Sequence, residues 1–183
     1  QVKRFLDLKE IIEQAYITVP LFHLLNTSGV FNYPEYHFDA VRCGIGLYGF
    51  ANQPDWDKSL LPIDRLSSTI VQLHRVEKGE SVGYNQGWIA AQKSQIAVLP
   101  IGHADGISRR FGKEVSKVWI NGQQAPIVGN VCMDMIMVDV THINCELHQR
   151  AILFDAEHTA HLFAKSAGTI SYELLTALSP RIK

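Results

Sequence analysis

The sequence has 183 residues, of which 46% are hydrophobic and 19% charged, and its formal net charge is −1. A chain of this length can bury a sizeable core, and its near-neutral charge argues against nucleic acid or anionic lipid as a partner and favours a small-molecule substrate. No apolar run is long enough to span a bilayer. Because the chain begins at Gln1, with neither an initiator methionine nor a signal peptide, we expect a piece of a longer protein.

The cysteines and histidines do not form a recognisable metal or disulfide pattern. Cys43, Cys132 and Cys145 are odd in number and widely spaced, which favours reduced thiols in the cytoplasm over a disulfide framework or a zinc ribbon. Cys132 has no neighbouring histidine to activate it, so a thiol nucleophile is not expected. His158 and His161 are three residues apart without a completing Cys or carboxylate cluster, and we expect a pair on a helix surface.

The first fifty residues predict alternating helices and strands. An amphipathic helix is predicted over 4–16, because its apolar residues recur at helical spacing. An apolar run over 19–25 and a second strand over 37–41 follow, and each ends in a polar or glycine-rich loop. Such chemistry at the carboxyl ends of strands is typical of α/β units.

The segment 51–62 contains two prolines and several polar residues, and we place a domain boundary there, dividing 1–62 from 63–183. The Asn121-Gly122 step beyond it predicts a hairpin, and the tail over 157–178 predicts two helices broken at Gly168. These features indicate a small β-barrel or sandwich followed by helices. Its strands are expected from five short runs rich in β-branched residues, at 68–73, 95–99, 115–120, 125–128 and 135–140.

Two loops after predicted strands could bind a phosphate. The segments 26–29 and 44–46 offer backbone and hydroxyl donors, which a phosphate requires. Glycine-rich turns after strands are usually only turns, so spacing alone leaves both interpretations open. Arg42 stands directly before the second loop, at a strand end where its side chain is expected to point into the mouth of a barrel.

Three further segments, 82–85, 100–106 and 128–134, combine glycine with polar or reactive residues. Tyr84 in the first could be reactive or could be a half-buried tyrosine that fills a turn. The second is a polar, flexible loop after an apolar strand, either functional or a simple turn. The Cys132-Met133 pair in the third is more typical of core packing than of catalysis.

Taken together, these segments resemble the alanine racemase family. The matching stretches, in order and spacing, are 23–29, 39–49, 82–84, 99–106, 126–134 and 168–173. One such motif would be weak evidence, whereas six in sequence are highly specific. The resemblance implies the last strand–helix units of a pyridoxal-phosphate-binding (β/α)₈ barrel over 1–62, followed by the family's β-rich C-terminal domain over 63–183.

The resemblance also implies a reaction. It is the interconversion of L- and D-alanine by a two-base mechanism with pyridoxal 5'-phosphate, supplying D-alanine for peptidoglycan. Tyr84 matches the base on the L-alanine face. The base on the other face is the lysine that holds the cofactor as a Schiff base; it lies early in the barrel of relatives, in a stretch that this chain does not match. The fragment alone is therefore expected to be inactive and to hold the cofactor weakly at most.

The remaining site residues are implied in the same way. Arg42 matches the arginine that hydrogen-bonds the pyridine nitrogen and, having no proton to give up, keeps that nitrogen unprotonated. His23 matches the residue that supports this arginine, and Met133 matches the backbone N–H that meets the substrate carboxylate. The residues that match the phosphate-binding set are Thr27, Gly44, Ile45 and Tyr172.

The family resemblance implies a homodimer in which the C-terminal domain of one subunit covers the barrel mouth of the other. Two positions depart from the family pattern. His103 stands where relatives usually carry a tyrosine in the substrate passage, and Asn130 replaces an arginine found in some relatives. Both could alter substrate preference or pH profile.

Alternatives remain open within and beyond the enzyme class. A racemase for serine fits as well as one for alanine, whereas a decarboxylase on the same plan fits the tyrosine and Cys-Met-Asp motifs less well. A non-catalytic interpretation is an isolated β-domain that serves as a dimerisation or binding module. We also expect the isolated chain to self-associate, through surfaces that would otherwise meet the rest of a barrel.

Overall fold

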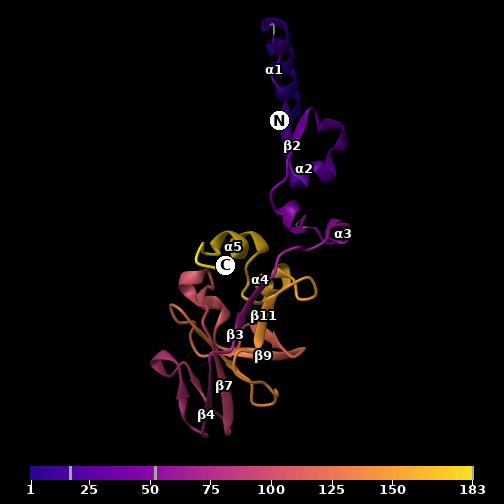
Figure 1. The fold of residues 1–183 in the computed structure, drawn as a ribbon. Coiled ribbons are helices and arrows are strands. Elements are labelled where there is room, and N and C mark those ends of the chain that lie inside the picture. Colours follow the sequence, from indigo (N-terminus) through magenta and orange to yellow (C-terminus); the bar gives the residue numbers. More distant parts are fainter. Residues whose placement is uncertain (17, 52, 183) are drawn as a thin grey trace. The chain divides into compact units, whose positions relative to one another are not determined.

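The computed structural model describes residues 1–16, 18–51 and 53–182. Its chain divides into two compact units, Gln1–Leu61 and Pro62–Lys183, which are indigo to purple and purple to yellow in Figure 1. Each unit has its own secondary structure. Among the described residues, no helix is long and apolar enough to cross a membrane.

The first unit contains two short parallel strands, each followed by a helical turn. Strands β1 (His23–Asn26) and β2 (Ala40–Arg42) pair with His23 opposite Ala40 and Asn26 opposite Arg42. Their carboxyl ends therefore lie side by side, and the loops that follow them begin at the same edge. The helical elements of the unit are α1 (Val2–Ala15), α2 (Thr27–Asn32), α3 (Pro54–Asp57), and 3₁₀ turns at Pro34–Tyr36 and Ile45–Tyr48.

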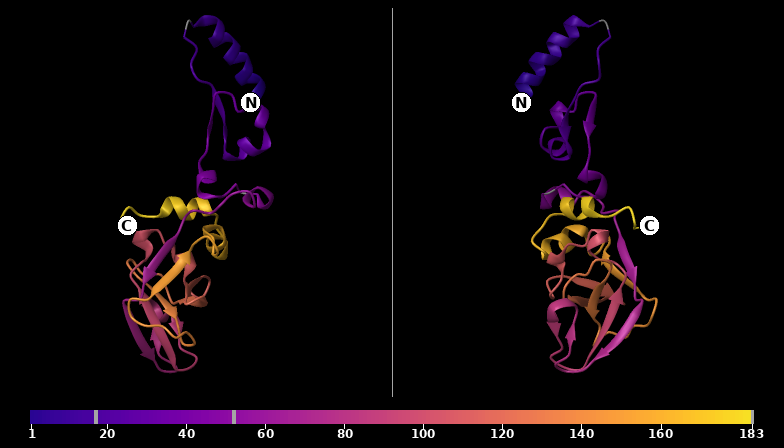
Figure 2. Two further views of the ribbon diagram at one scale, coloured as in Figure 1. Left: turned by 45° about the vertical axis from the view of Figure 1, so that its right-hand side comes forward. Right: turned by 90° about the vertical axis from the view of Figure 1, so that its left-hand side faces the viewer.

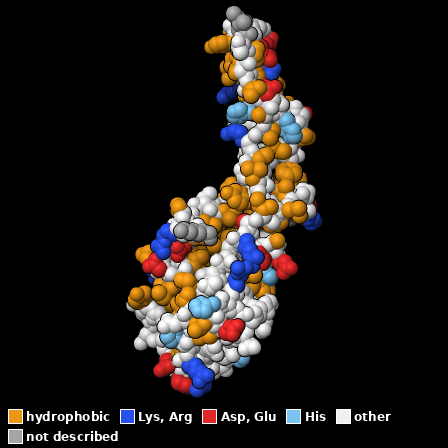
Figure 3. Space-filling view, in the orientation of Figure 1, with side chains coloured by type: hydrophobic (Ala, Val, Ile, Leu, Met, Phe, Trp, Pro, Cys, Tyr) orange, Lys and Arg blue, Asp and Glu red, His pale blue; other side chains and the backbone are white. Residues whose placement is uncertain are grey.

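Helix α1 confirms the helix predicted from apolar spacing, but none of its residues is buried. Leu8 and Ile11, on its apolar face, are 57% and 60% exposed. Figure 3 shows hydrophobic side chains gathered along this N-terminal unit. The periodicity thus predicts the helix correctly, while the apolar stripe that produced it has no partner among the described residues.

The second unit is built on one antiparallel sheet of seven strands. Their order is β3-β11-β8-β9-β10-β7-β4, and the sheet curls on itself, as the two views in Figure 2 show. A separate two-stranded hairpin joins β5 (Ser81–Val82) to β6 (Trp88–Ile89). The bounds of the seven strands are β3 (Leu66–Thr69), β4 (Gln72–Val76), β7 (Ser94–Leu99), β8 (Lys117–Ile120), β9 (Gln123–Val128), β10 (Ile136–Asp139) and β11 (Arg150–Phe154).

Side chains from neighbouring strands of this sheet form the core of the second unit. Val118, Ile127 and Ile136, from three neighbouring strands, are fully buried. Phe111 stacks on Phe163 of helix α4 (Ala160–Ser166), with ring centroids 4.6 Å apart. The β-branched runs therefore form strands because their side chains fill a shared interior.

The predicted hairpin is present, and one predicted strand is divided in two. Asn121 and Gly122 both have left-handed backbone angles, φ 51° and 72°, which the tight turn between β8 and β9 requires. The run 68–73 was expected to be a single strand, but it is split between β3 and β4. At the split, the Ile70 N–H donates to the Gln149 carbonyl, next to β11, and the Val71 N–H donates to the Val98 carbonyl in β7, so the chain passes from the neighbour of one edge of the sheet to the neighbour of the other.

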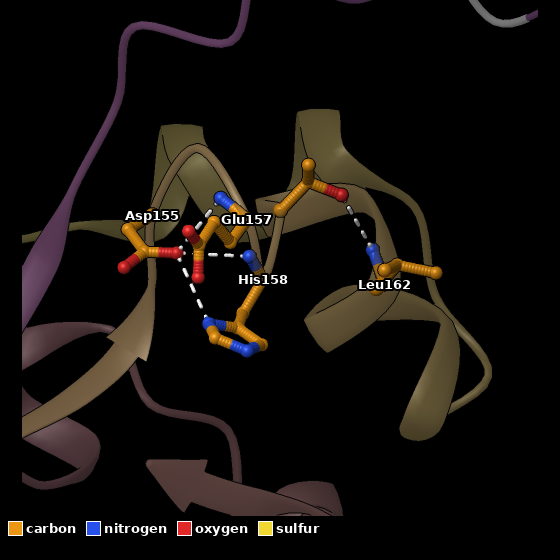
Figure 4. A network of polar contacts seen from close by, with 5 residues as sticks. Asp155, Glu157, His158 and Leu162 are labelled. Carbon is orange, nitrogen blue, oxygen red and sulfur yellow. Dashed lines mark hydrogen bonds and ion pairs between the residues drawn. The ribbon is translucent and has the colours of Figure 1, made fainter. Parts of the chain in front are cut away.

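The C-terminal helices end and begin around Gly168, as predicted. Helix α4 is followed by Gly168, whose φ of +67° favours glycine, and then by α5 (Ser171–Ala177). Thr159 caps α4 by accepting a hydrogen bond from the Leu162 N–H at 3.4 Å (Figure 4).

The turn before α4 corrects the expectation that His158 lies on a helix surface. His158 precedes the helix and stacks on Trp119, with ring centroids 3.6 Å apart. Asp155 accepts hydrogen bonds from the His158 N–H at 2.8 Å and the Glu157 N–H at 3.0 Å (Figure 4). Burial alone would raise the pKa of Asp155, but these bonds and the His158 ring hold it below its ordinary value. No group of three possible metal ligands occurs among the described residues.

Asp64, at the start of the second unit, is predicted to destabilise the fold at neutral pH. Both its carboxylate oxygens are buried, and no other described residue donates a hydrogen bond to them. Burial raises the pKa of this carboxyl, and its own backbone N–H offsets only part of that effect. Because the folded state favours the protonated form, stability is lost as pH rises from the ordinary aspartate pKa through the raised one.

We therefore expect Asp64→Asn to raise the unfolding free energy at pH 7 by less than about 1 kcal/mol, because solvent screens part of the charge on this partly exposed residue. The gain should vanish below about pH 3, because Asp64 is then mostly protonated in both the folded and the unfolded state. Thermal unfolding at the two pH values checks this, with the exposed Asp7→Asn as the control. An equal gain at both pH values would contradict the ionisation argument.

Candidate active site

The loops after β1 and β2 meet at Thr27. This residue is buried, and its Oγ1 accepts hydrogen bonds from the backbone N–H of Gly44 at 3.1 Å and of Gly46 at 3.3 Å. No described residue accepts the hydroxyl proton of Thr27 or the backbone N–H of Ile45. The loop pair therefore keeps two donors available at the place where the sequence predicts a phosphate.

Arg42 is the last residue of β2 and lies beside this loop pair. Its Nη2 donates to the carbonyl oxygen of Leu24 in β1 at 3.2 Å, which fixes the guanidinium at the carboxyl end of the parallel strands. The side chains of Arg42 and His23 are both exposed. No hydrogen bond between these two side chains occurs among the described residues, so the supporting role of His23 stays a prediction.

Tyr84 stands on a turn in the second unit whose backbone is largely left-handed. Gly83, Asn85 and Gln86 have φ values of 79°, 56° and 49°. The carbonyl oxygen of Tyr84 accepts a hydrogen bond from Asn130 Nδ2 at 2.8 Å, which ties the turn to the segment after β9. Tyr84 is 73% exposed, so the alternative of a half-buried tyrosine is wrong and its hydroxyl is accessible.

The segment that contains Met133 is held by the loop after β7. The His103 N–H donates to the Cys132 carbonyl at 2.9 Å, and the Ala104 N–H donates to the Met133 carbonyl at 2.8 Å. A Cβ on Gly102 would lie 2.6 Å from the Cys132 carbonyl oxygen, so only glycine permits this close approach. No described residue accepts the Met133 N–H, which leaves that donor available to a ligand.

Three other predicted residues complete the description. Tyr172 lies in the first turn of α5 and is 38% exposed, and His103 is exposed beside the Met133 segment. Burial raises the pKa of the Cys132 thiol, which the positive charge of Arg109 only partly opposes. A protonated thiol is a poor nucleophile, in keeping with the expectation from the sequence.

The predicted residues are thus divided between the two units. The phosphate loops and Arg42 belong to Gln1–Leu61, whereas Tyr84, Met133 and Tyr172 belong to Pro62–Lys183. Within the first unit the structure brings Thr27 and Gly44 together. Within the second, the Tyr84 carbonyl is bonded to Asn130, which belongs to the same segment, 128–134, as Met133.

Both units match models of known protein families. Residues 1–52 match the family model described as alanine racemase, N-terminal domain, and residues 63–183 match alanine racemase, C-terminal domain. The chain belongs to the alanine racemase family. The fold expected from the sequence, the last strand–helix units of the barrel followed by a β-rich domain, is confirmed by the structural relatives and the curled sheet.

Individual alanine racemases are similar over the whole chain. The alanine racemase of Clostridium tetani is 33% identical over 190 residues, which cover 100% of this chain and 49% of the relative. A structure of alanine racemase from Clostridium difficile 630 in complex with cycloserine matches with a TM-score of 0.88 at 34% identity, covering 100% of this chain and 49% of that one.

A further solved structure is alanine racemase from Bartonella henselae with covalently bound pyridoxal phosphate. It matches with a TM-score of 0.79 at 28% identity, covering 99% of this chain and 50% of that one. The chain therefore spans about half the length of the alanine racemases that it matches.

Two charged residues of the alanine racemase C-terminal domain escaped the sequence analysis. Asp105 is buried and accepts a hydrogen bond from the Gly102 N–H at 2.8 Å. Arg181 contacts Asp105 and Asp134 from the C-terminal segment. Asp105 falls inside a recognised motif, but no pattern in the sequence pairs it with an arginine so far along the chain.

Proposed function

We propose that the whole protein is a pyridoxal-phosphate-dependent racemase that interconverts L- and D-alanine and supplies D-alanine for peptidoglycan in the cytoplasm. The observation that carries the proposal is Tyr84, an exposed tyrosine fixed on a left-handed turn in a domain of the alanine racemase family. The working unit would be a homodimer, with Tyr84 acting on the cofactor bound by the other subunit.

The chain would contribute two parts of that enzyme. Residues 1–62 would form the end of the cofactor-binding barrel, and residues 63–183 the C-terminal domain. The lysine that holds the cofactor is expected in the remaining part of the barrel, so the chain alone would be inactive. The exposed apolar face of α1 supports this division, because such a face needs packing partners.

The residues present fit pyridoxal phosphate. The Thr27 hydroxyl and the Ile45 N–H are two available donors at one strand edge, and their chemistry suits a phosphate group. Arg42, fixed nearby by its bond to Leu24, would donate a hydrogen bond to the ring nitrogen. Gly44 would complete the phosphate loop, with Tyr172 contributing its hydroxyl from α5. The cofactor, when bound, withdraws electrons from the Cα–H bond of the attached amino acid and so acidifies that proton.

The protein's own residues would do the rest of the work. Met133 would orient alanine by donating its backbone N–H to the carboxylate. Tyr84 would then remove or return the α-proton through its hydroxyl oxygen on the L-alanine face. Two bases on opposite faces are needed, because a single base tends to return the proton to the side from which it came.

The direct test is racemisation by the whole protein with pyridoxal phosphate. We expect L-alanine to become an equal mixture of the two enantiomers, as measured by chiral chromatography, with L-serine assayed in parallel. Conversion of serine in preference to alanine would move the assignment to a serine racemase. No conversion of either, with a folded and cofactor-loaded protein, would favour the β-domain as a dimerisation or binding module.

A further inference from the structure

Arg181, near the C-terminal end of the described chain, joins two loops of the candidate site. Its Nε lies 3.4 Å from Asp105 Oδ1, and its Nη1 donates to Asp134 Oδ1 at 3.0 Å. The segment is attached to Asp105 a second time, because the Ser179 N–H donates to the Asp105 carbonyl at 3.1 Å. One guanidinium thus bridges a buried carboxylate and an exposed one.

The buried carboxylate anchors this bridge firmly. Asp105 is only 6% exposed, and its other oxygen accepts the Gly102 N–H at 2.8 Å. Gly102 begins the loop whose backbone holds the carbonyl groups of Cys132 and Met133. Arg181 is therefore connected to the Met133 segment twice, directly through Asp134 and indirectly through Asp105 and the loop that begins at Gly102.

The position of Asp134 gives the bridge an electrostatic role. Asp134 follows Met133, whose available N–H is the proposed contact for the substrate carboxylate. An uncompensated carboxylate next to this donor would repel an anionic substrate. The guanidinium of Arg181 is planar and carries several N–H donors, so it can contact both carboxylates at once. Its positive charge neutralises Asp134 beside the Met133 N–H.

We propose that Arg181 is a positioning residue for the substrate carboxylate, neutralising Asp134 and holding the Met133 segment in place. This inference rests on the proposed racemase function. It predicts an effect on KM for alanine rather than on kcat, because the binding of the carboxylate is weakened while the proton-transferring groups are unchanged.

The test compares KM and kcat for L-alanine in the whole protein with its cofactor. We expect Arg181→Gln to raise KM about tenfold, and added salt to reverse part of that increase by screening the exposed Asp134. The KM of Arg181→Lys should lie between those of the wild type and Arg181→Gln, because an ammonium group keeps the charge but cannot contact both carboxylates through a planar group. Asp134→Asn in the Arg181→Gln background should restore KM towards the wild-type value.

Controls separate this inference from simpler outcomes. Arg75→Gln removes an exposed arginine without a described ion pair and should leave KM unchanged. Should Arg181→Gln fail to fold, the single variant Asp134→Asn tests the inference instead. Its amide oxygen can still accept a hydrogen bond from Arg181, while its negative charge is gone. We expect Asp134→Asn to lower KM for L-alanine about twofold. Hydrogen exchange at the His103 and Ala104 amides should quicken in Arg181→Gln, which reports the loop independently of activity.

Two results would overturn the inference. One is an Arg181→Gln protein with unchanged KM, and the other is a raised KM that neither salt nor Asp134→Asn reduces. Either result would leave the proposed function intact as long as the wild-type protein racemises alanine. A wild-type protein that racemises no alanine would instead refute the proposed function itself.

Discussion

Replacing Tyr84 by phenylalanine in the whole protein should reduce racemisation of alanine by about 10²–10⁴-fold, the usual contribution of a positioned general base. The ring remains, so the turn at Gly83–Gln86 and its bond to Asn130 should be preserved. In deuterated water, the α-proton of L-alanine should lose its exchange with solvent, whereas that of D-alanine should still exchange on the opposite face. Mass spectrometry of each enantiomer after incubation measures both.

A control variant and an absorption spectrum test whether the loss of activity is specific to the Tyr84 hydroxyl. Tyr16→Phe removes the hydroxyl of another exposed tyrosine, outside the site, and should leave racemisation unchanged. The visible absorption of the bound cofactor should be the same in the Tyr84→Phe protein and in the wild type. Symmetrical loss of exchange from both enantiomers would mean that Tyr84 does not act on one face, and full activity would remove it from the mechanism altogether.

Gly106→Ala should be among the most damaging single substitutions in the second unit. Gly106 has a φ of +102°, and a Cβ placed there would lie 2.3 Å from the Ala177 carbonyl oxygen and 2.9 Å from Leu178 Cα. Backbone strain and collision add, so we expect a loss of about 3 kcal/mol or more in stability. The contact joins the loop after β7 to the end of α5, and displacement of α5 should carry the Ser179–Arg181 segment with it.

Gly79→Ala is the control that separates strain from collision. Gly79 has a similar φ of +90°, but its Cβ would meet nothing within 4 Å. The loss there should be limited to the conformational cost of about 1–2 kcal/mol. Calorimetric melting of both variants, with hydrogen exchange at the Ser179 amide, measures the difference. Equal melting temperatures for the two variants would show that the contact with Ala177 is not tight.

Local signals predicted most of the fold. The spacing of Leu8 and Ile11 predicts α1, and the Asn121-Gly122 step predicts the β8–β9 turn, because both depend on neighbouring residues alone. β11 was not predicted from the sequence, and the division at Ile70 and Val71 was not either. Both follow from the curling of the sheet, which depends on partners distant along the chain.

The same distinction between local and distant contacts holds for the candidate site. Motifs predict the residues that would touch cofactor or substrate, since a tyrosine between glycine and asparagine or a glycine-rich strand end is visible locally. They do not predict that Asn130 holds the Tyr84 carbonyl or that Arg181 meets Asp105. Such supporting contacts join segments that only the folded chain brings together, and their residue types carry no spacing rule.

The two edges of the curled sheet, β3 and β4, are consecutive in the chain but pair with strands made at very different times. During synthesis β4 can pair with β7 soon after it emerges, whereas β3 must wait for β11, the last strand of the sheet. Until Arg150–Phe154 leaves the ribosome, β3 presents unpaired backbone groups to its surroundings. A transcript cut short before that segment therefore yields a product with a permanently open edge, which invites aggregation and removal by proteases.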